Sequence, residues 1–236
     1  SPRPMCRGLS TQLSAMLRRG AIRASQSVSL GSVKPRIEVL HRGPGYAVVS
    51  RSRGEFTDCA DHLRLQNDWS GDPRPVGEWD RDVTGVQLIA GSGEVHQQLS
   101  VAWRQREFVH VYLAVLIGTL PSSYIESRSS ICVPSDDDEE MRLGGHIRQG
   151  HAALTAILPR SYGTVDGVKV TLCEVRPLAA RRHQARLHCA GIGHPVLGDS
   201  LYCVERRLEG RVLSPCYEQL LLHSWTLQGH HFSVTA

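Results

Sequence analysis

Residues 77–90 read GEWDRDVTGVQLIA and join a short acidic loop directly to an apolar run. Val86, Leu88 and Ile89 have the β-branched and aliphatic side chains of a buried strand. The loop therefore holds the Asp80 carboxylate at the rim of a core, rigidly placed by the strand and still open to a ligand. Taken alone, this stretch also fits a simpler interpretation, in which Asp80 is an ordinary turn residue.

Around this stretch, the apolar pattern predicts strands that alternate with a few helices. Turn residues at 42–45 separate the short apolar runs 37–40 and 46–49, which predicts a hairpin. Residues 93–106 repeat apolar side chains at helical spacing. Further helices are expected near 59–65 and 181–189, and further strands at 108–117, 153–158, 168–175, 220–227 and 232–234, with a polar turn at 162–167. Hairpins with helices between them predict an α+β fold around a largely antiparallel, mixed sheet.

A second informative stretch, residues 181–202, reads RRHQARLHCAGIGHPVLGDSLY. It is similar to the pattern GRxHQIRxHLxxxGHPLxGDxxY of the RluA-type pseudouridine synthases, which isomerise uridine to pseudouridine within RNA. WDRDVTGVQLIA resembles the HRLDRDTSGLLLLA signature of the same family. Three shorter segments also resemble it in the family order, at 111–114 (VYLA), 151–155 (HAALT) and 222–224 (LHS). The resemblance covers about residues 36 to 230 and implies the pseudouridine synthase catalytic fold.

The resemblance also implies the catalytic residues. Isomerisation requires the nucleotide to be flipped into a pocket, where the glycosidic bond breaks and C5 bonds to the ribose. Asp80 falls on the family's catalytic aspartate and is expected to act as nucleophile or as base. Arg186 is expected to pair with Asp80 and lower its pKa, and Tyr112 to lie under the flipped uracil and shuttle a proton at C5. We therefore expect these three side chains to converge on one cleft.

Basic residues near these motifs are the expected contacts to RNA. The formal charge is +4, but residues 136–140 hold five of the 23 acidic residues, and without them 27 basic residues face 18 acidic ones. This balance suits a polyanionic partner. The RNA-binding residues expected from the motifs are Arg51, Arg53, Arg81, Arg181, Arg182 and His183.

Cysteine and histidine usage predicts neither disulfides nor a metal site. The seven cysteines are an odd number without a C-x-x-C pair, which favours free thiols in a reducing compartment. The twelve histidines fit no ligand pattern. No run approaches the ~18 apolar residues of a membrane span. We expect no metal, no organic cofactor and no membrane partner.

The N-terminal segment has its own composition. Residues 1–37 contain seven basic residues, many serines and no Asp or Glu. This is typical of a mitochondrial transit peptide, and the alternative is a basic RNA-binding tail in another reducing, RNA-containing compartment. We expect an extension over 1–35 and one catalytic domain over 36–236. Within that domain, residues 121–150 hold the acidic run without clear periodicity and are expected to be a solvated insertion.

Departures from the family pattern leave two functions open. The family arginine two residues before the catalytic aspartate is Glu78 here, and a carboxylate at this place repels phosphate. Just ahead of the second stretch, where the family has Thr-Gly, this chain has Ala179-Ala180. The first function is an active synthase acting on structured RNA, ribosomal rather than transfer RNA, with another cation assisting base displacement. By motif position that cation is Arg51, Arg81 or Arg182. The second is a degenerate homologue that binds RNA in ribosome assembly together with other assembly proteins.

Overall fold

The structure is a computed structural model, and ten strands of its described part form one sheet. The residues described are 38–51, 63, 71–77, 80, 82–132, 142–144, 150–165, 167–179, 181–203, 207–208, 211–212 and 219–236. The strands of the sheet are β1 (Glu38–Gly43), β2 (Tyr46–Arg51), β3 (Arg74–Pro75), β4 (Thr84–Ala90), β5 (Val109–Ile117), β6 (Ile125–Ser127), β9 (Thr155–Val165), β10 (Val168–Pro177), β13 (Leu222–Gly229) and β14 (Phe232–Thr235). The helices are α3 (Gly93–Arg104) and α4 (Gln184–Gly191). Two small separate pairs are β7 (Ser130–Cys132) with β8 (Arg142–Gly144), and β11 (Arg207–Leu208) with β12 (Arg211–Val212).

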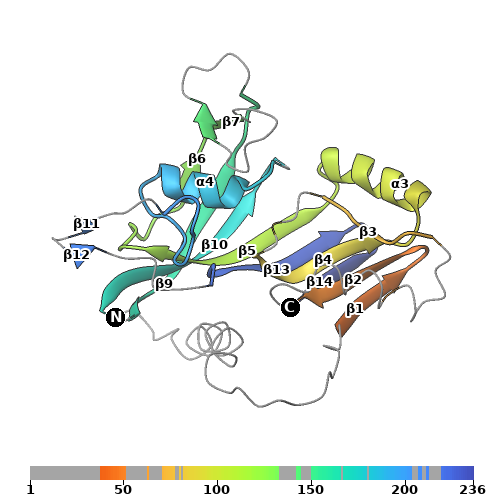
Figure 1. The fold of residues 1–236 in the computed structure, drawn as a ribbon, viewed down its shortest axis with the longest axis horizontal. Helices are drawn as coiled ribbons and strands as arrows, with labels where there is room; N and C mark the ends of the chain where they lie inside the picture. The colour runs from red at the N-terminus through yellow and green to blue at the C-terminus, as the bar shows by residue number, and fades with distance from the viewer. Residues whose placement is uncertain are drawn as a thin grey trace.

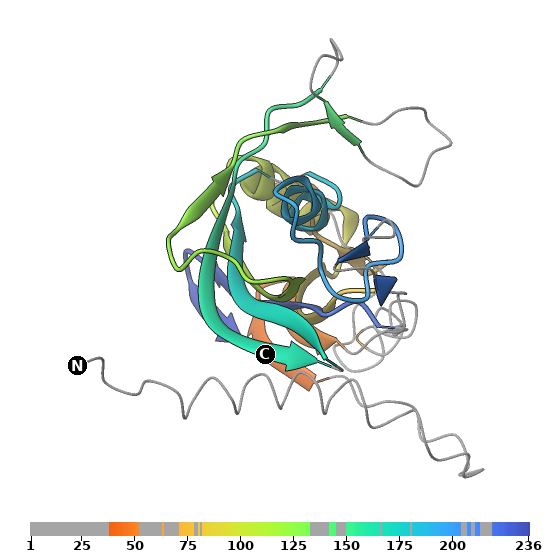
Figure 2. The same ribbon diagram turned by 90° about the vertical axis from the view of Figure 1, so that its left-hand side faces the viewer.

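The sheet is mixed and largely antiparallel. Its strand order is β1-β2-β4-β13-β5-β10-β9-β6, while β14 pairs with β13 and β3 pairs with β4. Within the described strands, β4 and β13 run parallel and the other pairs are antiparallel. Both helices cover the same face of the sheet, and the strands curve around them (Figures 1 and 2). The predicted α+β class is confirmed.

Most predicted elements appear near their expected bounds. The hairpin of β1 and β2 turns at Pro44 and Gly45. Helix α3 begins after Ser92, whose hydroxyl accepts a hydrogen bond from the Val95 amide at 3.3 Å, as N-cap serines do. It ends at Arg104 rather than at residue 106. The helix expected near 59–65 lies outside the described residues apart from Leu63, and the N-terminal extension lies outside them entirely.

The structure differs from two sequence predictions about the middle of the chain. Strand β9 continues through 162–165, which were expected to form a turn, because these residues pair with β10 as far as the partners Val165 and Val168. In segment 121–150, expected to be a solvated insertion, β6 extends the sheet beside β9 and β7 pairs with β8, while the acidic run 136–140 lies outside the described residues. Ile131 of β7 is 1% exposed and packs near Leu187 of α4. Strands of three residues are too short to show a hydrophobic period, so the sequence could not reveal them.

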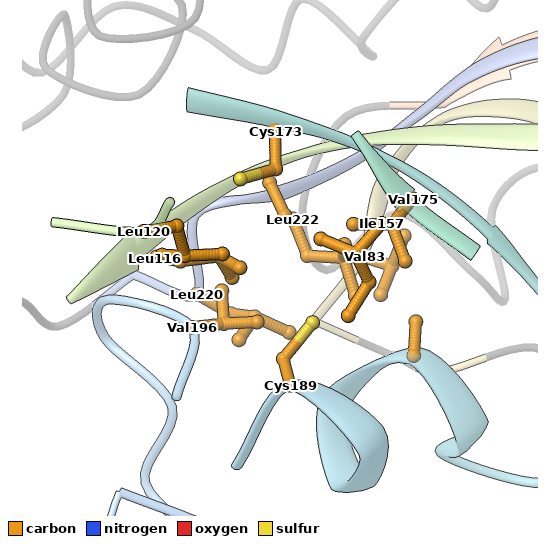
Figure 3. Close-up of a cluster of buried hydrophobic side chains, with 12 residues drawn as sticks. Val83, Leu116, Leu120, Ile157, Cys173, Val175, Cys189, Val196, Leu220 and Leu222 are labelled. Atoms are coloured by element: carbon orange, nitrogen blue, oxygen red, sulfur yellow. The ribbon is translucent and has the colours of Figure 1, made fainter. Parts of the chain in front are cut away.

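One hydrophobic cluster joins the sheet, α4 and the loop of Asp80. Cys189 of α4 reaches toward the sheet, where Leu116 and Leu222 lie (Figure 3). Val83, only three residues after Asp80, is 3% exposed and belongs to the same cluster. Burial of an aliphatic side chain contributes about 1.5–3 kcal/mol. Val83 therefore anchors the Asp80 loop to the core, as the opening stretch of sequence predicted.

Gly85 allows β4 to approach β13 closely. It pairs with Ser224 in the parallel ladder and has a φ of +101°, a conformation that favours glycine. A Cβ atom at this position would lie 2.1 Å from the Ser224 carbonyl oxygen. Next to it, Thr84 Oγ1 lies 2.8 Å from Nδ1 of His223. The Thr-Gly pair thus fixes where β4 starts, and with it the position of the preceding loop.

Cys132, Cys173 and Cys189 of the described part are buried, and Cys203 is partly buried. Burial raises the pKa of the Cys173 thiol to about 12, so this thiol stays protonated and inert. In the same described part, neither helix has the length and apolar character needed to cross a bilayer.

Candidate active site

Arg51 organises the loop that carries Asp80. Its guanidinium donates a hydrogen bond of 2.7 Å to the Asp80 carbonyl oxygen and another to the carbonyl oxygen of Val83. The Asp82 amide donates to Asp80 Oδ1 at 3.2 Å, which closes the turn. Arg51 is 3% exposed, so in this structure its charge faces the loop rather than solvent. The sequence placed Arg51 among the RNA contacts, whereas its side chain is buried and Nη2 of its guanidinium is turned to these carbonyls.

Arg186 on α4 lies between two carboxylates. Its Nε and Nη2 donate to Oδ2 and Oδ1 of Asp199 at 2.8 and 2.6 Å, a bidentate pair. Its Nη1 donates to Oδ2 of Asp80. Asp199 is fully buried and also accepts from the amides of Leu201 and Tyr202, both at 3.0 Å. Asp199 therefore holds Arg186 so that its third donor faces Asp80, and the predicted Asp80–Arg186 ion pair is present.

The charges in this cluster stabilise one another. Burial alone would raise the pKa of Asp80, but the charge and hydrogen bond of Arg186, helped by His183, bring that pKa below its usual value. Burial likewise opposes the charge of Arg186, yet the hydrogen bonds and charges of Asp199 and Asp80 raise the pKa of its guanidinium. Asp80 is therefore ionised at neutral pH, as a nucleophile or a general base must be.

His183 forms a second contact to Asp80. Its Nε2 lies 3.4 Å from Asp80 Oδ2, and its Nδ1 lies 2.7 Å from the hydroxyl of Tyr202. The Tyr202 ring also lies under the Arg186 guanidinium, 5.1 Å from ring centroid to Cζ. Burial lowers the pKa of His183 more than Asp80 raises it, so the imidazole is neutral at pH 7. The sequence placed His183 among the RNA contacts, whereas its side chain is only 8% exposed and lies within the carboxylate cluster.

Tyr112 on β5 forms another wall of the site. Its ring lies 4.2 Å, between centroids, from the ring of His110 on the same strand. Burial, followed by the charge of Asp80, raises the pKa of Tyr112 well above its ordinary value. The side chain is therefore a phenol at neutral pH and has a proton to donate.

These groups share one cavity of about 330 Å³. Asp80, Tyr112 and Arg186 all line it, together with apolar side chains such as Val83 and Leu222. The volume lies in the range of small-molecule sites, with a few polar groups on mainly apolar walls. The prediction that the three expected catalytic residues converge on one cleft is confirmed as geometry.

The other predicted RNA contacts are distributed unevenly. Arg181 is exposed and lines the cavity, while Arg182 is exposed and is not part of the lining. Arg53 and Arg81 lie outside the described residues, as does Glu78.

Sequence reasoning did not assign Asp199, Tyr202 or Arg106 to the site. The first two belong to the GD-x-x-Y pattern that was recognised, but their roles depend on contact with Arg186 across a turn. Arg106 lines the cavity from the end of α3, where no motif marks it. A physical signal did exist for Asp199, since a buried arginine requires carboxylate partners. In the described part of the chain, no group of three or more His, Cys, Asp or Glu side chains is arranged to hold a metal ion.

His110 makes the fold sensitive to acid, which provides a first prediction. Ser224 donates its hydroxyl proton to the Val86 carbonyl at 2.8 Å and accepts from His110 Nε2 at 2.6 Å. Burial lowers the pKa of His110 to about 3. In the unfolded chain the pKa of His110 is about 6.5. Between the two pKa values, unfolding therefore takes up a proton. The free energy of unfolding falls as pH drops below about 6.5, by at most about 1.4 kcal/mol per pH unit.

Urea unfolding between about pH 7 and pH 4 checks this linkage. His110→Gln is expected to be less stable at neutral pH but to lose less stability on acidification than the wild type. His183 and His188 also have lowered pKa values caused by burial, so the variant keeps part of the slope. An unchanged slope in His110→Gln would contradict the assignment.

A family model described as RNA pseudouridylate synthase matches residues 34–191. The chain therefore belongs to the RNA pseudouridylate synthase family.

Individual relatives agree with this membership. The dual-specificity RNA pseudouridine synthase RluA of Pasteurella multocida is 28% identical over 84% of this chain and 88% of its own. RNA pseudouridine synthases of Helicobacter pylori and Aquifex aeolicus, both described as uncharacterized, are 24% and 29% identical. These matches cover 73% and 72% of this chain, which spans only 61% and 51% of their lengths.

Two solved structures share the fold. Human RNA pseudouridylate synthase domain containing 1 aligns with a TM-score of 0.70 at 23% identity, covering 89% of this chain and 85% of that one. Human RNA pseudouridylate synthase domain containing 4 aligns with a TM-score of 0.67 at 21% identity, covering 84% and 87%.

Proposed function

We propose that this chain is an active RNA pseudouridine synthase that isomerises uridine in structured RNA. The observation that carries the proposal is the Asp80 carboxylate, held ionised by Arg186 inside a cavity that Tyr112 also lines. Membership of the RNA pseudouridylate synthase family supports it.

The geometry supports a role for each of the three side chains. A uridine displaced from its stack enters the cavity, and Asp80 attacks the nucleoside or removes a proton from it while the glycosidic bond breaks. Arg186 keeps Asp80 ionised and fixes its rotamer, because Asp199 anchors the other side of the guanidinium. C5 must lose its proton once it bonds to the ribose; Tyr112, a phenol in the resting site, relays this proton by taking it from C5 while it gives its own hydroxyl proton to the vacated N1.

We extend the proposal to ribosomal RNA in mitochondria. The acid-free, Arg- and Ser-rich composition of residues 1–37 supports targeting to this compartment. The relatives named above include a dual-specificity enzyme, and a further relative, 25% identical over 56% of this chain and 36% of its own, is the tRNA pseudouridine(31) synthase of Saccharomyces cerevisiae. Transfer RNA is therefore the alternative substrate, and mapping pseudouridines in cells that lack this protein would decide between the two.

A second candidate function is RNA binding without catalysis, in ribosome assembly with other assembly proteins. Glu78 in place of the family arginine favours it, because a carboxylate beside the catalytic aspartate repels RNA phosphate.

Tritium release from [5-³H]uridine separates the two functions. We expect the wild type to release tritium from an in vitro transcript of ribosomal RNA or transfer RNA. Glu78→Arg should keep or raise the turnover, since it replaces a repelling charge by an attracting one without changing Asp80. If neither the wild type nor Glu78→Arg releases tritium while both still bind RNA, the enzymatic function is refuted and the RNA-binding function remains.

A further inference from the structure

Arg106 lies on the wall of the active-site cavity, away from every recognised motif. The cavity is lined by the end of α3, through Trp103 and Arg106, and by the start of α4, through His183 and Gln184. In Figure 1 these two helix ends face each other above the sheet. Arg106 therefore brings a positive charge to the cavity from the helix opposite Arg186.

Arg106 has a backbone conformation that glycine normally adopts. Its φ is +64°, in the left-handed region. The Arg106 amide donates to the Trp103 carbonyl and the Glu107 amide to the Ala102 carbonyl, both at 3.1 Å. This is the Schellman pattern, in which glycine is the usual residue after the helix. An arginine at this position costs backbone free energy, and residues strained in this way cluster at active sites and ligand clamps.

Two of the other arginines that line the cavity are already engaged, and the third, Arg181, is an exposed residue that already belongs to the expected RNA contacts. Arg176 donates from Nε to Glu174 Oε1 at 2.6 Å, and the Glu174 side chain is 2% exposed. Arg186 is buried between its two carboxylates. Within the described residues, the guanidinium of Arg106 has no ion-pair or hydrogen-bond partner, and its side chain is exposed. It is therefore available to a phosphate.

We propose that Arg106 is the substrate-positioning cation of this active site. Its guanidinium binds the RNA backbone phosphate beside the displaced uridine. The proposal rests on the function proposed above, and it replaces Arg51, which is buried, as the cation that assists base displacement. Arginine is well suited to this role, because its planar fork matches phosphate oxygens.

Kinetics of Arg106→Gln against a matched control test the proposal. With the [5-³H]uridine transcripts, Arg106→Gln should lower kcat/KM by about 10- to 100-fold, as loss of one charged substrate contact does. Arg104→Gln removes another exposed arginine, in the last turn of α3 and outside the cavity lining, and its kcat/KM should stay within about twofold of the wild type. In the double variant Glu78→Arg/Arg106→Gln, the restored cation should recover most of the lost activity.

Arg106→Gly separates the substrate role from a structural one. Glycine relieves the left-handed backbone, so this variant should melt at a higher temperature than the wild type and still lose activity as Arg106→Gln does. If Arg106 only capped the helix, Arg106→Gly would keep full turnover. Full turnover in Arg106→Gly, or equal kinetics in Arg106→Gln and Arg104→Gln, would overturn the proposal.

Salt dependence keeps the test decisive even if the wild type releases no tritium. Binding of a ribosomal RNA stem-loop transcript, measured at several salt concentrations, should show a slope of log K against log[salt] that is smaller by about 0.7–0.9 in Arg106→Gln and unchanged in Arg104→Gln. If the wild type releases no tritium but Arg106→Gln shows this smaller slope, the enzymatic function is refuted and Arg106 is supported as a phosphate contact. If the wild type releases no tritium and the slope does not change, both the enzymatic function and the phosphate contact are refuted.

Discussion

Replacing Arg186 by Met is expected to lower the free energy of unfolding by about 3–5 kcal/mol, the cost of leaving a buried charge without its partner. The Asp199 side chain is fully buried, and Arg186 supplies two of its hydrogen bonds. The same change removes the cation that keeps Asp80 ionised and oriented. Turnover should therefore be lost together with stability.

Urea unfolding at pH 7 measures this loss, and a second substitution identifies its origin. Arg186→Met/Asp199→Leu removes both buried charges and keeps a similar side-chain volume, so it should recover most of the lost stability while remaining inactive. Recovery would show that the unpaired Asp199 carboxylate causes the destabilisation. A loss below about 1 kcal/mol in Arg186→Met would contradict the structural role of the pair.

The catalytic centre could be predicted because its residues lie in recognisable local patterns. Asp80 precedes a strand that is apolar enough to be buried, and Arg186 lies in a helix whose sequence matches a family block. Because Asp80 and Arg186 both match motifs of the same family, their contact can be inferred from the sequence, even though 106 positions separate them.

Residues whose role depends on burial could not be assigned from sequence. Arg51 keeps its charge inside the protein because two carbonyl groups of the Asp80 loop lie within its reach, and no local pattern distinguishes this arginine from one facing solvent. Arg106 was expected to continue α3, since arginine is a good helix former and no glycine marks the helix end. The left-handed turn there depends on tertiary context, and so does the position of this guanidinium at the cavity.

The predicted strand bounds were wrong where hydrogen bonding to a neighbouring strand outweighed the local turn preference of the sequence. Residues 162–165 are YGTV, a turn-like sequence, but β10 offers them a continuous antiparallel partner. Tertiary hydrogen bonding routinely overrides such weak local signals.

Asp80→Asn is expected to reduce turnover by at least about 10³-fold, or about 4 kcal/mol of barrier, with a smaller loss of stability at neutral pH than Arg186→Met. Asparagine keeps the carbonyl oxygen that accepts from Arg186 or from the Asp82 amide, and Arg186 keeps its bidentate pair with Asp199. What disappears is the negative charge that attacks the nucleoside or removes its proton. We expect a destabilisation of about 1–2 kcal/mol, the contribution of a hydrogen bond to a charged group.

The pH dependence of that stability difference tests the assigned charge state. The pKa of Asp80 is below its usual value in the folded chain, and about 3.9 in the unfolded chain. Its contribution is therefore fully present above about pH 4 and is lost as pH falls through the lower folded value. Asp80→Asn should thus be less stable than the wild type at pH 7, and the difference should shrink as pH falls below about 4. Asp72→Asn, at an exposed position outside the cavity lining, should keep full tritium release. If Asp80→Asn retained more than a tenth of the wild-type turnover, Asp80 would not be the catalytic carboxylate, and the chemistry would have to be assigned to another group in the same cavity.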